Sequence, residues 1–399
     1  MQKKLIALAV AGAFVAPAAF ADSGNVTIYG VMSASYDIVD NGNNNGERTS
    51  QVNDNSSRIG FKGSEDLGNG LSAVWQIESS INADGATPTA GFQGSSAGSL
   101  NGRNTFVGLS GKTWGTVILG RHDTPYKMAT RGLDVFADGI ADNRSLMGQS
   151  GAGTSFDGRQ SNVLAYISPN MNGFTVAAAY VAGAENVTND VQKKGDAWSL
   201  MGNYSNGPWT GALAYERHNV GTGGTGTLGL GLVGTTAGGA TLASAIPAVN
   251  AGVNASLTGV DLADREEHAW KVGVGYKANA FRVGFAYENT KDDFNGGSDL
   301  FGHNTWYLGG GYSFGNNEVK VAYTKMSDLG DFSNTGAKQW AIGLDHNFSK
   351  RTKIFALYTK LTNDTNSAFA LTGGSNGGPK GSVADSDPSA WSFGMTHSF

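Results

Sequence analysis

The sequence predicts an all-β protein, a 16-stranded antiparallel transmembrane β-barrel. Three observations lead to this fold class: sixteen short segments alternate apolar and polar residues, their connections are alternately short and long, and the 399 residues include 60 glycines. Alternation with a period of two is the pattern of a strand that has one apolar and one polar face. Short turns on one rim and long loops on the other are typical of membrane barrels.

The first 21 residues have the pattern of a secretory signal peptide. Two lysines at positions 3 and 4 precede a short apolar run, which ends in Ala-Phe-Ala at 19–21. We therefore assign residues 1–21 to the signal peptide and residues 22–399 to the barrel. Removing the two lysines from the 28 basic residues leaves 26 against 33 acidic ones, a formal net charge of −7. A charge of this size argues against a nucleic-acid partner.

Composition excludes several other classes. Beyond residue 21 no apolar run approaches the roughly 20 residues of a membrane helix. Because the chain has no cysteine, it has neither a disulfide framework nor a thiolate metal site. The six histidines lack metal-binding spacing, and no Ser-centred, Glu-x-x-His or calcium-loop motif is present. The sequence therefore indicates a protein that is not an enzyme, and it points to no cofactor or metal.

Sixteen segments carry the strand pattern and are separated by turn residues. In chain order they are residues 25–37, 57–65, 71–78, 103–110, 115–121, 162–168, 174–181, 197–204, 209–218, 268–277, 281–288, 304–314, 318–326, 339–348, 352–360 and 390–399. Tight turns at 66–70, 170–173, 205–208, 278–280, 315–317 and 349–351 alternate with longer segments such as 219–264. An even strand number with one-sided loop lengths favours a membrane barrel over the alternative, a soluble β-sandwich or β-helix.

Several segments separate their two faces cleanly. In residues 281–288 the apolar side carries Phe281, Val283, Phe285 and Tyr287, and in residues 304–314 it carries Trp306, Leu308, Tyr312 and Phe314. In 115–121 and 352–360 the alternation is not clean, so the sequence does not assign their faces. The last segment, 390–399, places Trp391, Phe393, Met395 and Phe399 on one face. We interpret it as the strand that closes the barrel against the first.

Residues 121–148 differ from the rest because their apolar residues have helical periodicity. Leu133, Phe136, Ala137, Ile140 and Ala141 gather on one side of a helix, with Asp134, Asp138 and Asp142 recurring every four residues beside them. The pattern predicts an amphipathic helical turn or two with an acidic face. Such a segment either lies on the surface or folds into the barrel and presents its carboxylates to the lumen.

Four basic residues are candidates for the opposite wall. Arg58 and Lys62 lie on the polar face of the second strand, and Arg103 and Arg121 lie near the ends of neighbouring strands. Basic side chains at membrane depth are costly unless they face water, which favours the lumen over the rim or a turn. Opposite Asp134, Asp138 and Asp142, they create a transverse field across a narrow pore. The alternative is that the aspartates form a solvated helix face without a role in a pore.

The order and spacing of several blocks resemble one known family across the whole of residues 22–399. The blocks are Val26-Thr27-Ile28-Tyr29-Gly30, Ser57-Arg58-Ile59-Gly60-Phe61-Lys62-Gly63, Glu65-Asp66-Leu67-Gly68, Phe106-Val107-Gly108-Leu109, Leu119-Gly120-Arg121, Asp142-Asn143-Arg144-Ser145 and the terminal Phe399. The chain resembles the trimeric general porins of Gram-negative outer membranes, nearest the neisserial-type branch. The long 219–264 segment departs from the family pattern.

The resemblance implies a 16-stranded barrel with the third external loop folded into the lumen, and residues 121–148 fall where that loop belongs. It also implies a homotrimer, surrounded by outer-membrane lipid, that lets ions and small hydrophilic solutes diffuse passively. The closing strand with Trp391, Phe393, Met395 and Phe399 is then also the signal for the outer-membrane barrel-assembly machinery. Two alternatives stay open, a substrate-specific channel and a barrel adhesin that acts through the external loop at 219–264.

Overall fold

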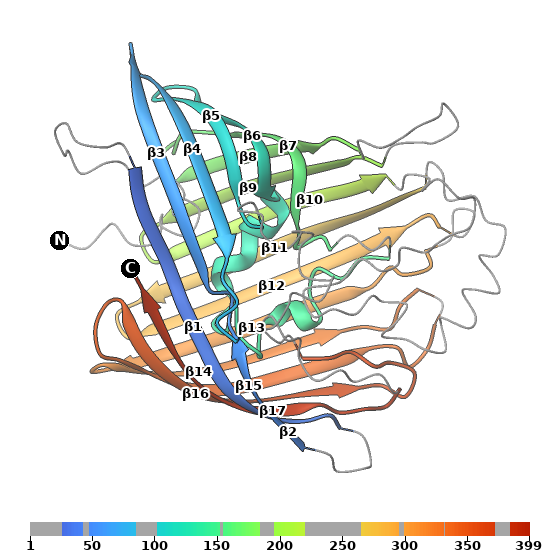
Figure 1. Cartoon of the computed structure of the whole chain (residues 1–399). Helices are drawn as coiled ribbons and strands as arrows, with labels where there is room; N and C mark the ends of the chain where they lie inside the picture. Colours follow the sequence, from blue (N-terminus) through green and yellow to red (C-terminus); the bar gives the residue numbers. More distant parts are fainter. Residues whose placement is uncertain are drawn as a thin grey trace.

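The computed structural model describes residues 26–42, 48–84, 102–151, 155–183, 195–219, 265–294, 299–330, 332–371 and 384–399. Within them the strands form one antiparallel sheet that closes on itself (Figure 1). The predicted signal peptide, residues 1–21, lies outside the described residues, as does nearly all of the 219–264 segment. Among the helices described, none is long and apolar enough to cross a membrane.

The sheet is built from 17 strand segments. The first nine are β1 (Val26–Asp40), β2 (Arg48–Asp54), β3 (Arg58–Gly68), β4 (Leu71–Ser80), β5 (Thr105–Gly111), β6 (Gly115–Asp123), β7 (Arg159–Ile167), β8 (Phe174–Val181) and β9 (Ala197–Asn206). The others are β10 (Trp209–Asn219), β11 (Glu266–Ala278), β12 (Phe281–Asp292), β13 (Asn304–Phe314), β14 (Asn317–Met326), β15 (Ala337–Asn347), β16 (Thr352–Asn363) and β17 (Ser389–Ser398). Three short helices, α1 (Pro125–Thr130), η2 (Arg131–Leu133) and η3 (Asn143–Ser145), lie between β6 and β7.

The 17 segments make 16 barrel strands, because β2 and β3 are two parts of one strand. Residues 34–40 of β1 pair with β2, and residues 26–31 of β1 pair with β3. Ser56, between the two parts, has a φ of 60°, which interrupts the extended backbone. On its other side β1 pairs with β17, from Val31↔Ser398 to Asp40↔Ser389. The predicted closure of the last strand on the first is therefore confirmed, as is the strand number.

Side chains alternate between the two faces of the barrel wall. On β12, Phe281 and Phe285 are exposed whereas Ala286 and Glu288 are buried. The structure also assigns the two strands whose faces the sequence left open. On β6, Ile118 is buried and Leu119 exposed, and on β16 Leu357 is buried and Ile354 exposed. These strands thus have an outward apolar face, which meets lipid in a membrane barrel, and a buried face.

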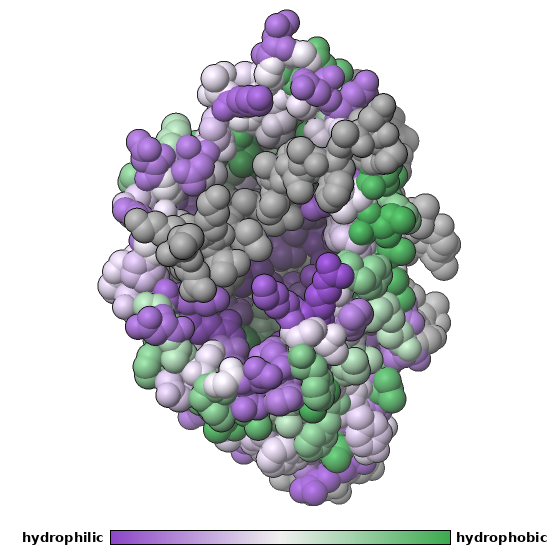
Figure 2. Space-filling model, turned by 90° about the vertical axis from the view of Figure 1, so that its left-hand side faces the viewer, coloured by the Kyte–Doolittle hydropathy of each residue, from purple (hydrophilic) through white to green (hydrophobic). Residues whose placement is uncertain are grey.

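The two rims differ as the sequence predicts. Tight turns, such as those after β9 and after β11, join strands at one end, and the long connections gather at the other end (Figure 1). Figure 2 looks onto the side with the tight turns and shows a hollow whose visible walls are mainly hydrophilic. In a membrane barrel the rim with the long loops is the external one.

Candidate functional site

The segment between β6 and β7 begins with a capped helix. The Thr124 side chain accepts a hydrogen bond from the backbone N–H of Lys127 at 3.3 Å, and Pro125 occupies the first turn, where its missing N–H costs nothing. Helix α1 is only six residues long and leads directly into η2. Helical turns therefore lie at 125–133, ahead of the three aspartates, and at 143–145, directly after Asp142.

The predicted amphipathic helix over the three aspartates is wrong. Asp134 has extended backbone, with φ −73° and ψ 118°, and Asp138 has a φ of 68°. The reason is the Asp134 carboxylate, which accepts the backbone N–H groups of Phe136 at 2.9 Å and Asn143 at 3.0 Å. An aspartate that bonds the backbone in this way competes with the helical hydrogen-bond pattern. Ala137, predicted on the apolar side, is exposed.

Arg131 brings the three aspartates together instead. Its guanidinium lies 2.8 Å from Asp138 Oδ1, 2.6 Å from Asp142 Oδ2 and 3.7 Å from Asp134 Oδ2. Arg144 pairs with Asp142 as well, at 2.9 Å between Nη2 and Oδ2. The side chains of Asp134 and Asp142 are 0% and 1% exposed, whereas that of Asp138 is 37% exposed. Of the three carboxylates, only Asp138 meets solvent.

The surroundings of the three carboxylates give them different pKa values. Burial acts to raise the pKa of Asp142, but Arg131 and Arg144 outweigh it and hold that pKa well below its usual value. The protein around Asp138 shields it in part and acts to raise its pKa, but Arg131, Arg58 and Arg144 outweigh this effect and hold that pKa below its usual value. Burial and the neighbouring charge of Asp142 raise the pKa of Asp134 to about 6.

Two of the four predicted basic residues lie near Asp138. Arg58 on β3 places Nη1 3.6 Å from Asp138 Oδ2, which joins the segment to the wall of the barrel. Arg103, just before β5, pairs with Glu78 on β4 at 2.5 Å, and its charge also acts on Asp138. Arg58 thus contacts an aspartate of the segment, whereas Arg103 acts on it through its charge alone.

The other two predicted basic residues occupy different positions. Lys62 is on the same face of β3 as Arg58, with Nζ 5.2 Å from the centre of the Tyr29 ring, and it makes no ion pair among the described residues. Arg121 donates to Ser161 Oγ at 2.6 Å and lies two residues beyond Leu119, which is exposed. The structure therefore does not bring Arg121 into the cluster around Asp138.

A buried glutamate on the wall holds both ends of the segment. Glu288 on β12 accepts a hydrogen bond through Oε2 from Tyr126 Oη, at the start of the segment, at 2.9 Å. Its Oε1 accepts the backbone N–H of Gly148, from the end of the segment, at 2.8 Å. Lys271 on β11 pairs with Glu288 at 3.1 Å and with Asp157 at 2.6 Å. Glu288 and Lys271 are fully buried, so these contacts are shielded from water.

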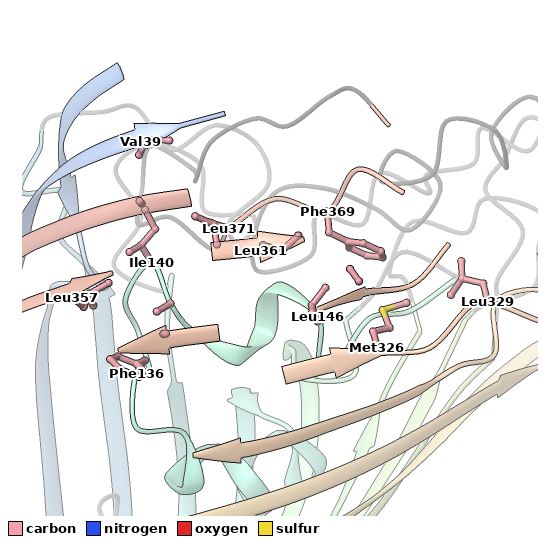
Figure 3. Close-up of a cluster of buried hydrophobic side chains, with 14 of the residues drawn as sticks. Val39, Phe136, Ile140, Leu146, Met326, Leu329, Leu357, Leu361, Phe369 and Leu371 are labelled. Carbon is pink, nitrogen blue, oxygen red and sulfur yellow. The ribbon is translucent and has the colours of Figure 1, made fainter. Parts of the chain in front are cut away.

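Apolar contacts fix the middle of the segment. Phe136, Ile140 and Leu146 belong to one buried cluster with side chains from β14, β16 and the connections that follow them, including Leu329 and Phe369 (Figure 3). Leu133 lies over glycines of β11 and β12, where a Cβ on Gly273 would come within 2.8 Å of Leu133 Cδ1. The segment therefore lies against the buried face of the wall from β9 to β16.

Sequence reasoning missed four residues that organise the site, namely Arg131, Arg144, Lys271 and Glu288. Arg131 and Arg144 flank the three aspartates at short spacing, which is a signal for pairing inside the segment. Lys271 and Glu288 stand among apolar and small residues on the buried faces of β11 and β12. Charges in such strands need partners, but the sequence does not show that the partners come from a segment more than 100 residues away.

The described residues contain no group of three or more His, Asp or Glu side chains arranged to hold a metal ion. The predicted assembly-signal residues, Trp391, Phe393, Met395 and Phe399, are exposed on the outward face of the closing strand. Gly30 and Phe399 exchange two backbone hydrogen bonds of 3.0 and 3.1 Å, so the last residue of the chain is part of the barrel closure.

Comparison with known proteins identifies the family. Residues 7–366 match the family described as Gram-negative porin. The chain is 27% identical over 379 residues to outer membrane porin protein 32 of Delftia acidovorans, covering 93% of this chain and 92% of that protein. It is 28% identical over 344 residues to the major outer membrane protein P.IA of Neisseria meningitidis serogroup C, covering 79% of each. Its match to an outer membrane porin protein of Bordetella pertussis, 32% over 251 residues, spans 55% of this chain and 60% of that protein.

Solved structures share the fold. The anion-selective porin from Comamonas acidovorans has a TM-score of 0.68 at 22% identity, over 94% of this chain and 99% of that one. The trimer form of OmpT from Vibrio cholerae has a TM-score of 0.62 at 16% identity, over 95% of this chain and all of that one. With the closed 16-stranded barrel, these matches show that the chain belongs to the Gram-negative porin family and is a general outer-membrane porin channel, not an enzyme.

Proposed function

We propose that residues 124–151 fold into the lumen and form the constriction of this channel. The observation that supports this best is that the segment contacts two opposite parts of the barrel wall. Glu288 on β12 bonds both ends of the segment, while Asp138 contacts Arg58 on β3. These contacts are made with the face of the strands opposite the exposed apolar side chains, and in a closed barrel that face lines the interior.

The charges around Asp138 give the constriction a preference for anions. Arg58, Arg103, Arg131 and Arg144 oppose Glu78, Asp134, Asp138 and Asp142, so the formal charges balance. However, the side chains of Asp134 and Asp142 are 0% and 1% exposed, whereas those of Arg58, Arg103 and Arg131 are 24%, 15% and 20% exposed. A passing ion therefore meets more positive than negative charge. Lys62 adds a further positive charge on the same wall.

Assembly and processing complete the proposal. Porins of this family are typically trimeric, and we extend the homotrimer to this chain. Residues 1–21 are removed on export, and Trp391, Phe393, Met395 and Phe399 present the closing strand to the barrel-assembly machinery. The outward apolar faces of the strands contact outer-membrane lipid.

The two alternatives make different demands. A substrate-specific channel needs a solute-binding set at the constriction, and the charged groups described there are mostly paired with each other. An adhesin would act through residues 219–264, most of which lie outside the described residues. Passive diffusion of ions and small hydrophilic solutes needs only the polar lumen and the narrowing.

The experiment is single-channel conductance in planar bilayers. Replacing residues 134–141 with a short glycine-serine turn removes the part of the segment that contacts β3, and conductance should rise. Circular dichroism in detergent should stay β-rich, because the ladder hydrogen bonds of the wall do not involve this segment. An unchanged conductance with an intact barrel would show that residues 134–141 are not the constriction.

A further inference from the structure

The outward face of the barrel carries a cluster of three lysines at the external rim. Lys325 on β14 and Lys338 on β15 are exposed, and Lys360 on β16 is 39% exposed at its side chain. By strand alternation they share the outward face with Val321, Trp340 and Ile354, which are also exposed. Each lysine lies near the strand end that leads into a long external connection.

The register places the three lysines next to one another. Lys325 is directly opposite Lys338 in the β14–β15 ladder. Lys338 is opposite Thr362 of β16, which puts Lys360, two residues away, in the diagonal position. Like charges directly opposite on a sheet destabilise the pairing, and diagonal neighbours are still within reach of long side chains. The fold therefore places three lysines at neighbouring positions of the sheet, where their like charges destabilise the strand pairing.

Among the described residues, one ion pair involves this cluster. Lys360 pairs with Asp387 at 3.4 Å, and both side chains are more than one-third exposed. In the part of the chain that the structure describes, neither Lys325 nor Lys338 has an ion-pair partner. An anion placed between Lys325 and Lys338 would relieve their repulsion and accept charge-assisted hydrogen bonds from both.

Aromatic residues lie directly below the lysines, toward the middle of the barrel. Tyr323 is opposite Trp340, each two residues from a lysine of the cluster. The rings of Trp306 and Tyr323 are 5.1 Å apart, and those of Trp340 and Tyr358 are 5.3 Å apart. Tryptophan and tyrosine gather at the level of lipid headgroups. The lysines are thus one step further out, at the depth of the headgroups of the outer leaflet.

We propose that Lys325, Lys338 and Lys360 bind a phosphate on the headgroup of an outer-leaflet lipid, whose acyl chains lie on the apolar faces of β14 to β16. Clustered lysines beside a membrane surface are suited to anionic headgroups. The aromatic residues and the exposed Val321 and Ile342 below the lysines favour a lipid over a free anion, because a free anion would gain nothing from them. The site is on the outside of the barrel, so it is independent of the constriction.

The test measures binding of lipid A, a phosphorylated glycolipid, to the purified full chain in detergent by native mass spectrometry. The triple variant Lys325→Gln, Lys338→Gln, Lys360→Gln should bind bisphosphorylated lipid A at least tenfold more weakly than the unaltered chain. The corresponding arginine variant keeps the three charges and should retain binding. The matched control, Lys112→Gln, Lys277→Gln, Lys350→Gln, removes three exposed charges at the opposite rim and should bind normally.

Two further measurements distinguish binding of the lipid headgroup from binding of a free phosphate. Lipid A that lacks one phosphate should bind the unaltered chain more weakly, and millimolar inorganic phosphate should not displace the bisphosphorylated lipid. The proposal is overturned if the glutamine triple variant binds as tightly as the unaltered chain, if the opposite-rim control loses as much binding, or if inorganic phosphate competes fully. Because none of the six lysines is buried, each variant should keep the β-rich spectrum and the channel conductance.

Discussion

Of the three clustered aspartates in the segment, only Asp138 meets solvent. Replacing it with asparagine removes this carboxylate charge and leaves the side-chain volume nearly unchanged. An ion passing about 4 Å from a unit charge in water interacts with it by about 1 kcal/mol. A Debye length of about 8 Å at physiological salt reduces this to about 0.6 kcal/mol. Since about 1.4 kcal/mol corresponds to a factor of ten, removing the charge changes each permeability by about threefold, upward for anions and downward for cations. Asp138→Asn should therefore raise the anion-to-cation permeability ratio by at most about sevenfold.

The assay is the reversal potential of single channels across a potassium chloride gradient. The control is Glu65→Gln on β3, which is also a carboxylate-to-amide change but lies at an exposed position on the opposite face from Arg58. Arg58→Gln should shift the ratio by a similar factor toward cations, because it removes the positive partner of the same contact. If the reversal potential of Asp138→Asn equals that of the unaltered channel, Asp138 is not at the constriction.

Three other predictions use different observations. The pKa of Asp134 is raised to about 6, so this carboxylate is charged at pH 7.5 and neutral at pH 5, where it no longer offsets the charge of Arg131. The anion preference, measured by reversal potential, should therefore rise as the pH falls. Asp134→Asn should make the anion preference nearly independent of pH over this range. Glu288→Gln leaves one acceptor oxygen for three donors, Tyr126, Gly148 and Lys271, so single-channel records should show more frequent closures. Glu318→Gln, on the same wall but paired with Arg282, should not show them. Phe399→Ser should lower the amount of inserted barrel in outer-membrane fractions, and normal insertion would contradict an assembly role.

The strands could be predicted from the sequence because the barrel wall enforces a local rule. Each residue of a strand faces either lipid or the interior, so the apolar period is visible in a window of a few residues. Where the rule weakens, the prediction weakens with it. The wall at β6 has a register shift between Gly120 and His122, and this strand is one of the two whose faces the sequence leaves open. The break at Ser56 likewise hides the extension of the second strand to Arg48.

The segment between β6 and β7 was only partly predictable because its conformation depends on distant residues. Apolar side chains at 133, 136, 140 and 141 indicate correctly that one side packs, but their helical spacing does not produce a helix. Asp134 instead bonds the backbone, and Arg131 gathers the aspartates. The wall supplies Glu288, Lys271 and the glycines under Leu133. None of these wall partners is encoded in the periodicity of the segment itself.

The three aspartates show why identical charges in one stretch of sequence do not have one role. Asp142 is buried between Arg131 and Arg144, so its charge neutralises guanidinium groups that would otherwise lie unpaired in a shielded site. Asp134 is buried on backbone N–H groups and shapes the turn. Asp138 alone combines solvent exposure with contact to the barrel wall. A field that acts on permeating ions must come from charges that water, and therefore ions, can approach. The proposed selectivity accordingly depends on Asp138 and its arginine neighbours. Asp134 and Asp142 keep those arginines in place and determine how much of their positive charge is offset.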